Sequence, residues 1–275
     1  MSHPSSARSR FRNVIVAGCL CVQASLSPVA FAAESFTAGL LILPSSGWTP
    51  EQTPVDFLDV VGLQTKARWR QLYRQPPPVP STDRPRAAFT LGALVGDALL
   101  ALQAEDSQQF RNTNQDVLAY CRVLGLGEKV SPRLMAMAKL AEENRWADLR
   151  QEAVDGQQEL SRLLIDQRDE ELAALVDLGT WLRTLELAST LVLEAPEQEV
   201  KPLCIGAHAL LMDLQVKFSQ LPEATRSQEA MVPVGETISF LVRHWDIGKD
   251  TKPSEELVMK THEKLKNLMK KLTLR

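Results

Sequence analysis

The chain has 275 residues, of which 44% are hydrophobic and 24% are charged, and its formal net charge is −3. A weakly acidic chain lacks the concentrated basic charge with which proteins hold nucleic acid, so we expect no nucleic-acid partner. A chain of this length also buries enough apolar surface to fold without the support of disulfides.

The first 32 residues have the pattern of a cleaved secretion signal. Arg8, Arg10 and Arg12 precede a mostly apolar run over residues 14–29, and residues 30–32 read Ala-Phe-Ala, the small-residue pattern of a cleavage site. Cleavage there removes three positive charges and no acid, which changes the net charge from −3 to −6. The predicted location is periplasmic or secreted.

A lipoprotein signal is the alternative interpretation, because residues 16–19 read Val-Ala-Gly-Cys and look like a lipobox. The apolar run before Cys19 is shorter than an h-region of roughly 7–15 residues, and the residues after it stay apolar. We therefore expect cleavage after Ala32. A partly apolar lead-in over residues 33–48 and a single all-α domain over residues 49–275 would follow.

Two of the four cysteines, Cys121 and Cys204, remain in the predicted mature chain. An oxidising compartment allows them to form a disulfide. Two buried free thiols are the alternative, because cysteine is among the residues most often buried. The sequence leaves these two interpretations open.

Apolar positions recur with helical spacing along the chain, and alternating runs of β-branched and aromatic residues are missing. The predicted fold class is all-α, a helical bundle or an irregular helical-hairpin array of about seven to nine helices. The expected helices cover about 53–74, 87–105, 107–124, 132–140, 146–194, 204–221, 232–247 and 254–274, with a candidate break at 167–171.

Residues 75–80 read Gln-Pro-Pro-Pro-Val-Pro, which cannot form a helix because proline lacks the backbone N–H. Such a segment is typical of a stiff, extended spacer. Polyproline ligand motifs have the same composition and are the alternative. We predict a spacer between two helices.

The helix beginning near Ala87 is the most apolar stretch after the predicted signal. Ala88, Gly92 and Gly96 recur every four residues, so they form a face without large side chains. We predict that this face is buried against one partner helix over residues 178–191, which would bring Asp97 towards Arg183. Asp97 also interrupts the run before it reaches the ~18 apolar residues of a membrane span, so we expect no transmembrane span.

A faint internal repeat relates this helix to the later one. Ala87, Leu91-Gly92 and Leu100-Ala101 match residues 174, 178–179 and 187–188 in type and spacing. Duplication of a helical hairpin explains the match, and so does chance in a chain rich in leucine and alanine. The known solenoid repeat signatures are not present.

The sequence lacks the common catalytic and cofactor-binding motifs. The sequence contains no Gly-x-Ser-x-Gly elbow, no phosphate-binding Gly-x4-Gly-Lys, no His-Glu-x2-His and no Cys-x2-Cys. We therefore expect a protein that is not an enzyme and needs no cofactor. Cys204 and His208 lie four residues apart and could offer two metal ligands, but a zinc site needs three or four, so we expect no metal.

Four polar residues near the two apolar helices are the candidates for ligand binding: Asp97, Gln103, Arg183 and Glu186. An interhelical Asp97–Arg183 bridge is the structural interpretation, because buried charges are normally paired. A polar cleft with these four side chains on its wall is the functional interpretation.

The predicted function is that of an exported, periplasmic helical protein that acts by binding or scaffolding, with an unknown partner. The alternative is a helical small-molecule sensor or carrier with a polar pocket near Asp97 and Arg183. A deep pocket lined by the polar candidates would favour the carrier, and an exposed apolar groove would favour the binding protein.

Overall fold

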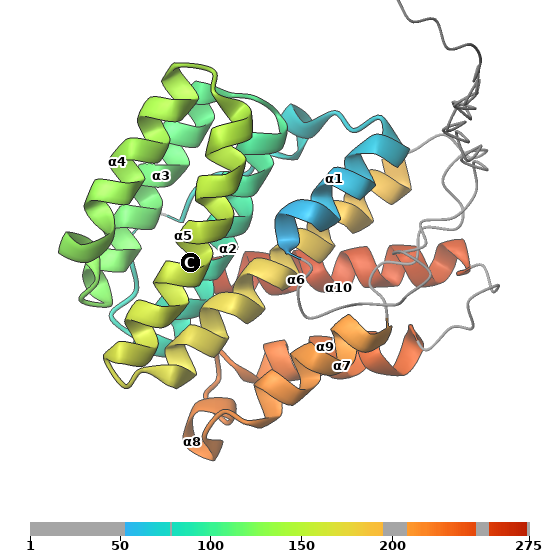
Figure 1. Cartoon of the computed structure of the whole chain (residues 1–275). Helices are drawn as coiled ribbons and strands as arrows, with labels where there is room; N and C mark the ends of the chain where they lie inside the picture. Colours follow the sequence, from blue (N-terminus) through green and yellow to red (C-terminus); the bar gives the residue numbers. More distant parts are fainter. Residues whose placement is uncertain (1–52, 78, 195–207, 246–252, 274–275) are drawn as a thin grey trace, which may run out of the picture. The chain divides into compact units, whose positions relative to one another are not determined.

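The computed structural model describes residues 53–77, 79–194, 208–245 and 253–273 (Figure 1). Within these ranges it has ten α-helices, nine of them of seven or more residues, one short 3-10 helix and no strand. The predicted all-α class is confirmed. The predicted secretion signal, the lead-in over residues 33–48 and Cys204 lie outside the described residues.

The elements follow one another in this order: α1 (Pro54–Thr65), η1 (Trp69–Leu72), α2 (Arg84–Gln103), α3 (Ser107–Val123), α4 (Gly127–Glu142), α5 (Trp146–Asp166), α6 (Glu170–Glu194), α7 (His208–Ser219), α8 (Glu223–Arg226), α9 (Val232–His244) and α10 (Glu255–Thr273). The long helical pattern over 146–194 is broken at the candidate position, between α5 and α6. The short helix α8 was not expected from the sequence.

Helices α2 and α6 pack against each other at the centre of the fold, where their backbones come into contact. A Cβ atom added at Gly92 would lie 2.0 Å from the carbonyl oxygen of Val176, and one at Gly96 would lie 2.8 Å from Cγ of Arg183. Ala88 is fully buried. The prediction that this face meets the helix over residues 178–191 is therefore confirmed, with the contact beginning slightly earlier, at Val176.

Four successive turns with the same hydrogen-bond pattern join α2 through α6. Each turn ends a helix with one residue of positive φ, and the next N–H donates to a carbonyl five residues back, as in a Schellman motif. The residues of positive φ are Glu105, Gly125, Asn144 and Arg168. These hydrogen bonds run from the N–H of one residue to the carbonyl of the residue five before it: Asp106 to Ala101, Leu126 to Cys121, Arg145 to Leu140 and Asp169 to Leu164. This part of the chain is an array of antiparallel helical hairpins.

The bounds of α1 and α4 differ most from the sequence expectation. Helix α1 begins with a capping box of Thr53 and Asp56 but ends at Thr65 rather than near residue 74. Lys66 adopts a φ of 50° and reverses the chain, so that the ring of Trp69 packs against Gly62. Helix α4 begins five residues before Pro132, because the preceding Schellman turn already starts its hydrogen bonds.

Helix α2 is the one described helix that has the length and hydropathy of a membrane span, and 78% of its most apolar window is buried within the protein. A helix that is apolar on all sides is typical of a protein core or a membrane. In this structure α3, α6 and α10 pack against it.

Candidate functional site

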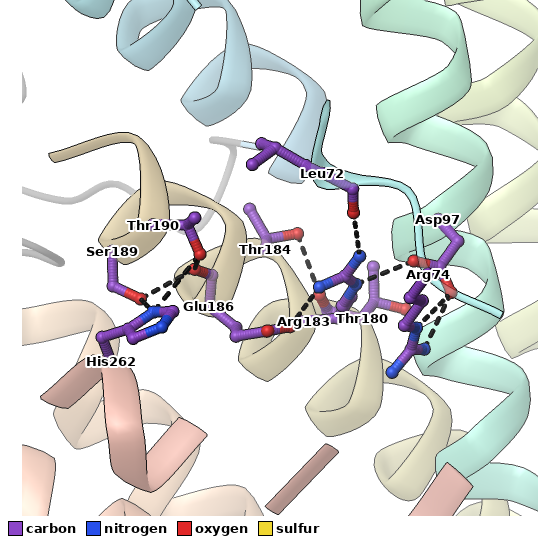
Figure 2. Close-up of polar contacts among 10 residues, drawn as sticks. All are labelled: Leu72, Arg74, Asp97, Thr180, Arg183, Thr184, Glu186, Ser189, Thr190 and His262. Atoms are coloured by element: carbon purple, nitrogen blue, oxygen red, sulfur yellow. Dashed lines mark hydrogen bonds and ion pairs between the residues drawn. The ribbon is translucent and has the colours of Figure 1, made fainter. Parts of the chain in front are cut away.

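A buried polar network connects α2 and α6 to the segment that follows η1 (Figure 2). The carboxylate of Asp97 accepts a hydrogen bond from Nε of Arg183 at 2.8 Å on one oxygen. On its other oxygen it accepts bonds from Nε and Nη2 of Arg74 at 2.9 and 2.7 Å. The predicted approach of Asp97 to Arg183 is therefore confirmed, and Arg74 is an additional partner that sequence reasoning missed.

Arg183 is only 2% exposed. The remaining nitrogens of its guanidinium contact two further groups. It pairs with the carboxylate of Glu186 one turn along α6, and its Nη2 donates to the carbonyl of Leu72 at 3.3 Å. Two guanidinium groups and two carboxylates balance in charge. Such balance is what allows charges to be buried at tolerable cost.

The network also determines the charge states of its members. Burial by itself raises the pKa of Asp97, but the positive charges of Arg183 and Arg74 outweigh it and hold the pKa below its usual value. Burial likewise opposes the charge of Arg183, whose pKa is nevertheless raised by Asp97 and Glu186. Asp97 and Arg183 are therefore both ionised at neutral pH.

The space beside the network is small. A cavity of about 20 Å³ is lined by Tyr73, Arg74, Asp97 and Asp116, among others. The hydroxyl of Tyr73 is buried and has no hydrogen-bond partner among the described residues. A cavity of this size holds about one water molecule, since ~10–15 Å³ is enough for one. The cavity is therefore too small for a ligand larger than a water molecule.

Gln103, the fourth predicted site residue, does not belong to this network. Its amide donates to Asp59 of α1 at 2.5 Å, and Asp59 also pairs with Arg150 of α5. Gln103 follows Asp97 by six residues of helix, about 9 Å along the axis. The structure therefore places Gln103 apart from the other three candidates, because a helix carries residues six apart to different neighbours.

His262 extends the polar contacts from α6 to α10, and no pattern in the sequence predicts this contact. Nδ1 of His262 lies 3.3 Å from the hydroxyls of both Ser189 and Thr190. Both hydroxyls donate to the carbonyl of Glu186, so the ring nitrogen is the donor in its contacts with them. Burial lowers the pKa of His262, with the charge of Glu186 acting in the opposite direction.

The described cysteine is not in a reactive setting. Cys121 is buried in α3, and burial raises the pKa of its thiol to about 12. A thiol with so high a pKa is a poor nucleophile at neutral pH. The disulfide between Cys121 and Cys204, one of two interpretations that the sequence leaves open, and the Cys204–His208 pair both involve Cys204, which lies outside the described ranges. Among the described residues no three His, Cys, Asp or Glu side chains gather as metal ligands.

A much larger groove lies elsewhere, along the first three turns of α6. It has a volume of about 830 Å³, with α5 and α7 as its sides and the N-terminus of α1 contributing Thr53 and Pro54. Ala173 and Ala174 provide small side chains from α6, and Ile165 of α5, which is 48% exposed, adds apolar surface. The sequence did not predict this groove.

One side of the groove carries a charged cluster. Nζ of Lys217 in α7 lies 2.5 Å from a carboxylate oxygen of Asp177 and 2.8 Å from one of Asp213. Burial acts against the charge of Lys217, but the two carboxylates outweigh it and raise its pKa. Arg162 lines the groove from α5. The groove thus combines apolar surface with polar groups on both sides.

Comparison with models of protein families, with curated protein sequences and with solved structures finds no match to this chain.

Proposed function

We propose that this protein is an exported, periplasmic helical protein that acts by binding a segment of a partner protein in the groove between α5, α6 and α7. The observation that carries the proposal is the groove itself, with its volume of about 830 Å³ and its apolar and small residues on α5 and α6. Binding sites are commonly concave, with volumes of about 300–1,000 Å³, mostly apolar walls and a few polar groups.

The carrier alternative finds less support in the geometry. Asp97, Arg183 and Glu186 satisfy one another's charges, and the cavity beside them measures about 20 Å³. A ligand entering there would have to break buried ion pairs, which typically costs about 3–5 kcal/mol. We infer that the network holds α2, α6 and the segment after η1 together, and that the binding surface is the separate groove.

Site-specific crosslinking in the exporting host tests the proposal. A photoreactive amino acid at Ile165 lies in the groove, whereas one at Met135, which is 65% exposed on α4, lies outside it. We expect discrete protein adducts from position 165 and none of the same size from position 135. Ala174→Arg fills the groove and should abolish the adduct, provided that its melting temperature is unchanged. Identical adducts from both positions, or adducts that survive Ala174→Arg, would contradict the proposal.

Export requires its own test. N-terminal sequencing of protein recovered from the periplasm should begin at Ala33, because the expected cleavage site is at residues 30–32. An intact Met1, or a lipid attached to Cys19, would overturn the export route proposed here.

A further inference from the structure

The last four turns of α10 carry a charge opposite to that of the chain as a whole. Residues 259–273 contain five lysines and one glutamate, in a protein whose net charge is −3. Lys266, Lys270 and Lys271 are exposed and form no ion pair with any described residue. Lys260 is exposed as well and pairs with Glu256 at 2.6 Å.

The packing of α10 presents these lysines outward. Its apolar positions, including Leu265, Leu268 and Leu272, are buried against the protein, with α6, α9 and α2 as the neighbouring helices. The exposed face of α10 therefore consists mainly of its polar and charged side chains. Met259, Glu263, Lys266 and Lys270 follow one another at helical spacing along one stripe of it.

The end of the helix is held in place from α2, so the lysines sit on an anchored support. Nε of Arg86 donates to the carbonyl of Leu272 at 3.2 Å, which satisfies a carbonyl that lacks a partner within the helix. Nearer the middle of α10, Lys264 lies 5.3 Å from the centre of the Phe240 ring of α9, which is also stacked on His244.

We propose that the exposed face of α10 that carries Lys266, Lys270 and Lys271 binds the surface of a bilayer that contains anionic lipids. Flexible lysines on the outer side of a single helix suit a flat layer of negative headgroups, and Met259, which is 47% exposed, adds an apolar contact on the same stripe. Attraction acts over about one Debye length, ~10 Å, so the acidic remainder of the protein opposes it only weakly. This inference does not depend on the groove.

Nucleic acid is the competing anionic partner, and the face fits it less well. Single-stranded binders add aromatic platforms on which bases stack, and sequence readers use the planar fork of arginine. The exposed stripe of α10 offers neither, because its cationic side chains are lysines and its one exposed apolar side chain is Met259.

Vesicle co-sedimentation of the full chain tests the proposal. The probes are vesicles of 30% phosphatidylglycerol in phosphatidylcholine and vesicles of phosphatidylcholine alone, at low and at moderate salt. Lys266→Gln/Lys270→Gln should weaken partitioning into the anionic vesicles about 30-fold, since each lysine near such a surface contributes about fivefold. Binding to the neutral vesicles measures the contributions that do not depend on lipid charge, including that of the apolar run over residues 14–29.

Lys129→Gln/Lys139→Gln on α4 is the matched control, because both lysines are exposed and lie on another helix. The control should bind the anionic vesicles as the wild type does, and added salt should release both. Equal binding by the α10 variant and the control would overturn the proposal. Absence of binding to the anionic vesicles at low salt would also overturn it. The same holds if the protein binds a short DNA duplex but not vesicles, and if this DNA binding requires Lys266 and Lys270.

Discussion

Gly92 on α2 and Gly179 on α6 lie at the point where the two helix backbones touch. A Cβ at Gly92 would come within 2.0 Å of the carbonyl oxygen of Val176, and one at Gly179 within 2.1 Å of the carbonyl oxygen of Phe89. Each glycine thus makes room for the other helix. These two residues are also the matching glycines of the faint internal repeat, so the repeat coincides with the place where the backbones of α2 and α6 touch.

Gly92→Ala should destabilise the protein strongly. Alanine is favoured over glycine in a helix by about 1 kcal/mol, but the added methyl group would collide with backbone atoms that no rotamer change can move. Because the helices must separate, we expect a net loss of about 3 kcal/mol in the free energy of unfolding. Urea denaturation of the variant measures this loss. A free energy of unfolding equal to that of the wild type would show that the backbones of α2 and α6 do not touch at Gly92.

Gly156→Ala on α5 is the matched control and should have the opposite sign. A Cβ there would lie 3.4 Å from Cδ of Arg133 and 3.8 Å from Sδ of Met137, both ordinary contacts. The gain in helix propensity should therefore appear as a stabilisation of about 1 kcal/mol. A loss of stability at this position would mean that glycine is needed there for a reason other than space.

Asp97→Asn should cost about 3 kcal/mol, because it leaves two guanidinium groups facing a neutral amide in a buried site. The pKa of Asp97 is lower in the folded protein than the ~3.9 of an unfolded aspartate. Its contribution is therefore complete above that unfolded value and is lost as the pH falls through the folded one. Unfolding free energies measured from pH 6 to pH 3 should show a shallower acid loss in the variant, and parallel curves would contradict the assignment.

His262 should make stability depend on pH in a higher range. Its pKa is lowered in the folded protein, so below about pH 6.5 the unfolded chain binds a proton more readily. Stability should fall as the pH drops from 7 through the folded-state pKa and then level off. His262→Asn can still contact the Ser189 and Thr190 hydroxyls but cannot titrate, so its stability should be flat over this range. If the dependence of stability on pH is unchanged in the variant, a group other than His262 causes it.

Arg168→Gly in the turn between α5 and α6 should stabilise the protein. Arg168 holds a φ of 62°, a conformation that strains an ordinary residue by about 1–2 kcal/mol and that glycine adopts freely. Greater chain entropy of the unfolded variant offsets part of this gain, so we expect a net stabilisation of about 0.5–1 kcal/mol. Gly125→Ala, at the equivalent place in the turn between α3 and α4, should destabilise by a similar amount. Thermal melts of both variants provide the measurement.

The sequence by itself determined those features that depend on neighbours along the chain. Helical periodicity and capping residues indicated the all-α class, and the spacing of Ala88, Gly92 and Gly96 indicated a face made for close approach. The energetic cost of burying Asp97 alone implied that it has a partner or faces water, and Arg183, in an apolar setting, was the candidate partner. These features follow from local geometry and from the cost of an unpaired charge, both of which can be read from residue order.

Tertiary structure alone decided which distant groups meet. Gln103 bonds to Asp59 rather than joining Asp97, and His262 reaches α6 from the last helix, because the paths of α1 and α10 set those contacts. Helix α1 ends where the chain folds back to pack Trp69 on Gly62. The groove exists because α5 and α7 flank the first turns of α6. A gap between helices is a property of their relative placement, which no local pattern in the sequence records.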